Sequence, residues 1–133
     1  MQQNFARVAP PTRRNFVKYN GKDSVDFSDD EFLEVPYKHL TENKREYVLS
    51  KQLLRSGTSI GANVTEAKRG QSRADLVSKM AIALKEADET AYWLRLLYET
   101  QYLTNAEYES MSRDASELIA LLVAICKTSN ATN

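Results

Sequence analysis

The sequence predicts an all-α protein, an antiparallel up-down four-helix bundle whose first helix is short or kinked. Four helix-start signals follow one another along the chain, and apolar residues recur at steps of three and four after the last three of them. No β alternation of any length appears. The expected connections are about three or four residues long, so consecutive helices should be antiparallel neighbours.

The length of the chain, 133 residues, corresponds to one domain with a single core. Residues 1–27 contain the turn-forming stretches APPTRRNF and YNGKDS and little helical periodicity, so we expect an irregular N-terminal arm there. The bundle is expected over residues 28–128, followed by a disordered tail at 129–133. The longest apolar patch, residues 118–126, is too short to span a membrane.

Each helix-start signal is a Ser, Thr or Asn followed three residues later by a carboxylate, the pattern of a capping box. The four pairs are Ser28 with Glu31, Asn43 with Glu46, Ser72 with Asp75, and Thr104 with Glu107. The first helix is expected over 29–40, where Pro36 should kink it or move its start to a later residue.

The other three helices are expected over 44–68, 73–100 and 105–127. The first of these has an amphipathic pattern, with Leu49, Leu53, Ile60 and Val64 on one side. The last two carry more apolar surface than one bundle face needs, which suggests contact with another subunit. A wide core in a monomer is the alternative.

Glycines interrupt the segment RSGTSIGANVTEAKRG, although each costs roughly 0.5 to 1 kcal/mol in a helix interior. A phosphate-binding loop has four residues between its two glycines, followed by Lys-Ser or Lys-Thr. The segment around Gly57 and Gly61 has neither feature. Four residues apart, both glycines should lie on one face of the helix, where a second helix can approach closely. Gly70 is interpreted as a C-terminal cap glycine.

Charge is segregated along the chain, although the net charge is zero. Residues 44–73 hold seven basic and two acidic residues, and residues 74–110 hold three basic and seven acidic ones. Part of the positive charge should pair within the molecule, and the rest could contact phosphates. The candidate nucleic-acid-binding residues are Lys44, Lys51, Arg55, Lys68, Arg69 and Arg73.

The sequence offers no catalytic or metal-binding set. Di-metal sites in bundles need Glu-x-x-His pairs, but His39 is the one histidine and is expected to be solvated or to complement a helix dipole. Glu86 and Glu89 should form salt bridges with Lys79, Lys85 or the basic helix. Cys126, the one cysteine, lies in an apolar row and should behave as a buried hydrophobe. We therefore expect no enzyme, no cofactor and no metal.

Four aromatic residues of the stretch YWLRLLYETQY could stack on bases, but their helical spacing favours core or interface positions. They are Tyr92, Trp93, Tyr98 and Tyr102.

The stretches EYVLSKQLLRSGTSIGANVTEA and SKMAIALKEADETAYWLRLLYE carry a family resemblance. Over about residues 37–127 the chain resembles the bacterial four-helix bundle family first noticed as reading frames in intervening sequences of large-subunit ribosomal RNA genes. That family includes accessory subunits of diversity-generating retroelements. The resemblance implies an antiparallel bundle that assembles as a ring, commonly a pentamer, without known catalytic activity. In retroelement members it also implies a basic surface that binds nucleic acid and a reverse transcriptase partner, matched here by Lys51, Arg55, Lys68 and Arg69.

We therefore expect a non-enzymatic, homo-oligomeric scaffold that binds RNA or an RNA-protein complex. A protein-interaction module without a nucleic-acid role is the alternative. A core site for a small molecule has no supporting polar residues. With one cysteine and no signal-peptide pattern, a cytoplasmic location is expected.

Overall fold

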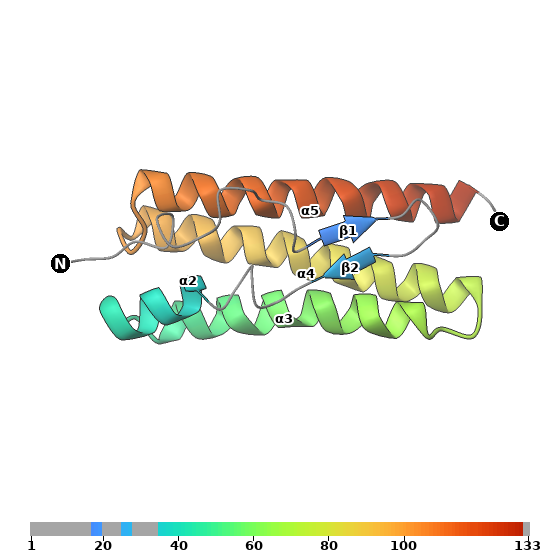
Figure 1. Cartoon of the computed structure of the whole chain (residues 1–133), viewed down its shortest axis with the longest axis horizontal. Coiled ribbons are helices and arrows are strands. Elements are labelled where there is room, and N and C mark those ends of the chain that lie inside the picture. The colour runs from blue at the N-terminus through green and yellow to red at the C-terminus, as the bar shows by residue number, and fades with distance from the viewer. Residues whose placement is uncertain (1–16, 20–24, 28–34, 132–133) are drawn as a thin grey trace.

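The computed structural model describes residues 17–19, 25–27 and 35–131. Three long helices run along the length of the molecule: α3 (Val48–Lys68), α4 (Arg73–Glu99) and α5 (Asn105–Ala131). As Figure 1 shows, α4 lies between α3 and α5 and packs against both of them. The helix predictions for 73–100 and 105–127 are confirmed within one to four residues at their ends. Together with the short α2 (Val35–Lys38), four α-helices are present in the described part of the chain.

The first helix is short, as the sequence predicts. Within the described residues it begins at Val35, so Pro36 occupies the first turn, where a missing N–H leaves no helical hydrogen bond broken. It continues directly into a π-helical turn, η2 (His39–Asn43), and the residues around Ser28 and Glu31 lie outside the described part. Helix α2 contacts α3.

The predicted helix over 44–68 starts too early, because the chain turns between Lys44 and Tyr47. Arg45 has a φ of 55°, and the amide of Glu46 donates to the carbonyl of Leu40 at 2.9 Å, which closes the turn. The Asn43–Glu46 capping box is therefore wrong. Instead, the Glu46 carboxylate accepts hydrogen bonds from the amides of Val48, Leu49 and Ser50, at 3.1, 2.9 and 2.7 Å, and caps α3 directly.

The other two caps form as predicted. The Ser72 hydroxyl accepts from the amide of Asp75 at 3.1 Å at the start of α4. At the start of α5, the Glu107 amide donates to Thr104 Oγ1 at 3.2 Å and the Thr104 amide donates to Glu107 Oε1 at 2.8 Å. This pair is a complete capping box.

Two expectations about the ends of the chain differ from the structure. Residues 17–19 and 25–27, predicted to belong to an irregular arm, form the antiparallel strands β1 (Val17–Tyr19) and β2 (Val25–Phe27), with Lys18 opposite Asp26. Strand β2 contacts α3. At the other end α5 continues to Ala131, so residues 129–131 are helical and not a disordered tail. The remaining residues of the predicted arm and tail lie outside the described part.

The core lies between the three long helices and consists of aliphatic side chains at the predicted steps. In α3, Leu53, Ile60 and Val64 are buried, as the sequence predicts. In α4 and α5 the buried set includes Leu94, Leu97, Leu118, Leu122 and Ile125. No helix in the described residues combines the length and apolar character needed to cross a bilayer.

Candidate nucleic-acid interface

The predicted basic residues lie on or next to α3, with one exception. Lys51 and Arg55 are exposed and one turn apart, Lys68 is the last residue of α3, and Arg69 is its C-cap. Arg73 begins α4. Lys44 caps the end of η2 before the chain turns, so it lies outside α3, although the helix predicted over 44–68 includes it.

Arg55 is paired within the molecule. Its Nη1 lies 3.5 Å from Glu86 Oε2, its Nη2 contacts Glu89 Oε2, and its Nε donates to Gln52 Oε1 at 3.2 Å. The expectation that Glu86 and Glu89 pair with the basic helix is therefore confirmed. Because two carboxylates surround this half-exposed guanidinium, Arg55 contributes less positive charge to the surface than its sequence position suggests.

The rest of α3 remains basic. Glu66 is the one acidic residue in its sequence, and its Oε1 lies 2.6 Å from Lys79 Nζ on α4. Lys51, Lys68 and Arg69 are exposed, on or directly after a helix whose one carboxylate is paired with a neighbouring helix. Arg73 adds a fourth cation at the turn into α4.

Gly57 and Gly61 both lie inside the continuous helix α3, as predicted, and neither belongs to a loop. Gly57 is buried. Beside it, Ser56 Oγ and Thr90 Oγ1 are 2.9 Å apart and buried, so this part of α3 meets α4 through small and polar groups. Gly70 follows the C-cap, and a Cβ there would lie only 3.1 Å from the Asp75 Cβ, so the close approach of α4 favours glycine.

His39 was predicted to be solvated or to complement a helix dipole, but only 4% of it is exposed. Its Nε2 lies 3.1 Å from Glu107 Oε2, and Asn43 Nδ2 lies 3.1 Å from its Nδ1. Glu107, also buried, thus binds both the start of α5 and η2. Sequence spacing gave no signal for this contact because the two residues are far apart in the chain.

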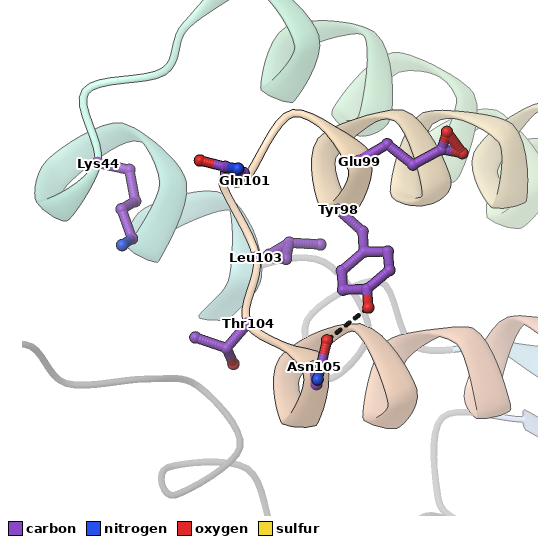
Figure 2. Close-up of a pocket in the computed structure, with 7 residues that line it drawn as sticks. All are labelled: Lys44, Tyr98, Glu99, Gln101, Leu103, Thr104 and Asn105. Atoms are coloured by element: carbon purple, nitrogen blue, oxygen red, sulfur yellow. Dashed lines mark hydrogen bonds between the residues drawn. The ribbon is translucent and has the colours of Figure 1, made fainter.

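A shallow pocket of about 560 Å³ lies at the α4–α5 turn, beside η2 (Figure 2). Lys44 faces it across the turn from Gln101 and Thr104. On the other side of the turn, the Tyr98 hydroxyl donates to Asn105 Oδ1 at 2.5 Å. The pocket is open, and its lining combines Lys44 and Glu99 with uncharged polar groups and Leu103.

Among the described residues, no group of three or more His, Cys, Asp and Glu side chains could hold a metal ion. Cys126 is half-buried against the core, and burial raises the pKa of its thiol. A raised pKa lowers the thiolate fraction, which is the reactive form.

Modification of Cys126 by a thiol reagent is therefore expected to be slower in the native protein than in the unfolded chain at pH 8. The rate should rise as the pH increases beyond the pKa of an ordinary cysteine. A chromogenic disulfide reagent, applied with and without denaturant, measures both rates. Equal rates in the two states would contradict this prediction.

The fold and surface define a small antiparallel helical-bundle protein with one basic helix. A family model described as 23S rRNA-intervening sequence protein matches residues 24–124. The chain belongs to this family, which confirms the resemblance seen in the sequence. The link to retroelement accessory subunits stays a prediction.

A solved structure supports the fold. A crystal structure of a protein with unknown function from the S23 ribosomal protein family of Bacteroides thetaiotaomicron is 54% identical to this chain. The alignment covers 71% of this chain and 85% of that one, with a TM-score of 0.70. A comparison with curated proteins finds no match.

Proposed function

We propose that the protein is a non-enzymatic, homo-oligomeric scaffold of the cytoplasm that binds RNA through the exposed cations of α3. The observation that carries this proposal is the charge of α3, whose one carboxylate is paired with Lys79 while Lys51 and the C-cap residue Arg69 are exposed. Lysine and arginine contacts to phosphates supply affinity without reading the sequence of bases. The family description, which refers to 23S rRNA, supports RNA as the ligand.

Assembly would strengthen a weak basic surface. One chain presents only a few phosphate contacts and has no net charge. Several copies held together would engage one RNA at several points, and linked contacts bind more tightly than single ones. Four large apolar side chains, Tyr47, Val48, Ile82 and Tyr92, are exposed on the described surface, which fits a protein that contacts other subunits. The family resemblance makes a pentameric ring the expected assembly.

We expect the affinity for a structured RNA hairpin to fall steeply between about 50 and 200 mM salt, because binding releases counterions from the phosphates. Replacing Lys51, Lys68, Arg69 and Arg73 together by alanine should weaken binding and reduce the slope of log K against log salt by about 3. Arg55 is left intact because it pairs with Glu86 and Glu89 on α4. Fluorescence anisotropy of labelled RNA at several salt concentrations measures both quantities.

The matched control replaces Lys85 and Arg113 by alanine, since both are exposed cations outside α3. This variant should keep the salt slope of the wild type. If the wild type binds no RNA, or binds it without salt dependence, the RNA role is wrong.

The rival function is a protein-interaction module in which nucleic acid has no role. The exposed apolar side chains on α3 and α4 favour this candidate as much as they favour self-assembly. Purification of bound proteins from a nuclease-treated lysate separates the two. A stoichiometric protein partner that persists after nuclease treatment, together with absent RNA binding, would support the rival.

A further inference from the structure

The turn before α3 places an exposed aromatic ring among basic side chains. Tyr47 is the N-cap of α3, and 59% of it is exposed. Its backbone angles are already right-handed helical, so Lys51, four residues later, is its neighbour on the helix surface. Arg45 lies two residues before Tyr47, in the turn, and both it and Lys51 are exposed. We call this surface the turn platform, formed by Arg45, Tyr47 and Lys51.

The turn platform is basic because the one carboxylate in this stretch of sequence is used within the fold. Between Lys44 and Arg55 the chain holds four cations and one acidic residue, Glu46. Only 7% of Glu46 is exposed, and its carboxylate accepts hydrogen bonds from three amides of α3. Within the described part of the chain, no carboxylate forms an ion pair with Arg45 or Lys51. Both cations therefore remain open to an anionic partner.

Tyr92 on α4 offers a comparison, because it is almost as exposed as Tyr47, at 57%, but has different neighbours. Asp88 and Glu89 precede it by one helical turn, and its ring packs edge-on against Trp93, with 5.0 Å between the ring centroids. Carboxylates beside the ring repel phosphates. The charge around Tyr47, and not its exposure alone, therefore distinguishes it as a contact for a polyanion.

An aromatic ring flanked by cations fits an unpaired nucleotide. The base offers a flat apolar face, and the phosphates on either side of it carry the negative charge that Arg45 and Lys51 attract. Inside a duplex, neighbouring bases cover both faces of each base, so a protein ring stacks only on bases that are unpaired. Stacking on tyrosine tolerates any base, because every base has such a face.

We propose that the turn platform binds an unpaired base of an RNA strand, stacked on Tyr47 and held through phosphate contacts to Arg45 and Lys51. This inference rests on the proposed RNA-binding function and specifies its ligand as single-stranded RNA. It also adds Arg45 and Tyr47 to the site, since neither was among the candidate residues taken from the sequence.

The first test measures the affinity of the wild type and of Tyr47→Ala for a labelled polyuridine strand and for a labelled blunt-ended duplex of the same length. Fluorescence anisotropy at low salt gives both dissociation constants. Loss of the stacked base should weaken binding of the single strand by at least about 10-fold, and binding of the duplex by less than about twofold. Tyr47→Phe keeps the aromatic ring and should retain the affinity of the wild type.

The matched control is Tyr92→Ala, which removes a tyrosine of similar exposure from α4. Its affinity for both RNAs should equal that of the wild type. Both tyrosines are exposed, so the variants should keep the fold, which circular dichroism checks. Light scattering measures the mass of each variant.

The second test locates the contact on the wild type by photochemical crosslinking to a polyuridine strand that carries thiouridine. Mass spectrometry of the tryptic digest should find the crosslink on the peptide of residues 46–51, which contains Tyr47. An excess of unlabelled single strand should prevent the crosslink, and the same excess of duplex should prevent it less effectively.

The outcomes separate this inference from the proposed function. A wild type that binds neither RNA would contradict both. RNA binding that Tyr47→Ala leaves unchanged, or weakens equally for single strand and duplex, would contradict the turn platform alone. A lower mass of Tyr47→Ala with unchanged RNA affinity would identify Tyr47 as a subunit contact instead.

Discussion

Replacement of Glu107 by alanine is expected to lower the free energy of unfolding by about 2 to 4 kcal/mol, because it removes a helix cap and leaves buried polar groups without a partner. The carboxylate is 1% exposed, lies 3.1 Å from His39 Nε2 and accepts a hydrogen bond from the Thr104 amide at 2.8 Å. Without it, the imidazole loses a polar neighbour and the Thr104 amide loses its acceptor. Urea denaturation followed by circular dichroism measures the change.

Glu109→Ala is the matched control, since Glu109 lies two residues after Glu107 on the same helix but is exposed. Its effect should stay within about 0.5 kcal/mol, as for ordinary surface substitutions. A double-mutant cycle with His39→Ala isolates the pair, and the two losses should not add. A loss below 1 kcal/mol for Glu107→Ala would show that this contact does not hold η2 to α5.

Leu53→Ala is expected to cost about 2 to 5 kcal/mol, since it removes a buried leucine and leaves a cavity in a packed core. Leu53 has no exposed surface and belongs to the core cluster of the three long helices. Thermal and urea denaturation of the wild type and the variant give the difference in stability.

The neighbouring Leu54 provides the control, because it is only half-buried at the edge of the same core. Leu54→Ala should cost clearly less than Leu53→Ala, since less apolar surface is lost from the interior. Equal losses at the two positions would contradict the assignment of Leu53 to the centre of the core.

Short-range features of the fold could be predicted from the sequence because their causes are local. The capping residues Ser72 and Thr104 act on amides three residues away, so their patterns survive folding unchanged. The amphipathic spacing of Leu53, Ile60 and Val64 likewise reports the buried side of α3 without knowledge of its neighbours.

The turn before α3 was missed for a specific reason. A carboxylate three residues after Asn43 fits a capping box, but Glu46 can also cap the helix that follows it, and the spacing cannot distinguish the two. The positive φ of Arg45 could not be predicted either, because residues in this conformation are usually glycines. The three-residue strands β1 and β2 are too short to show an alternating pattern.

The candidate site could be predicted only in part. The sequence placed the cations on α3, but the partner of each one depends on which residues α4 brings near. Arg55 is therefore less available than its position suggests, and Lys44 belongs to the end of η2. The burial of His39 could not be predicted from the sequence for the same reason, because Glu107 contacts it only once α5 has packed.

The contact between η2 and α5 also has a consequence for the order of folding. Helices α3, α4 and α5 follow one another through short turns, so their packing closes small loops and should form early. Docking of His39 on Glu107, in the first turn of α5, must instead close a loop that contains both α3 and α4, which costs more chain entropy. We expect this end of the molecule to form last and to open first, so the amides of η2 should exchange with solvent deuterium faster than those in the middle of α4.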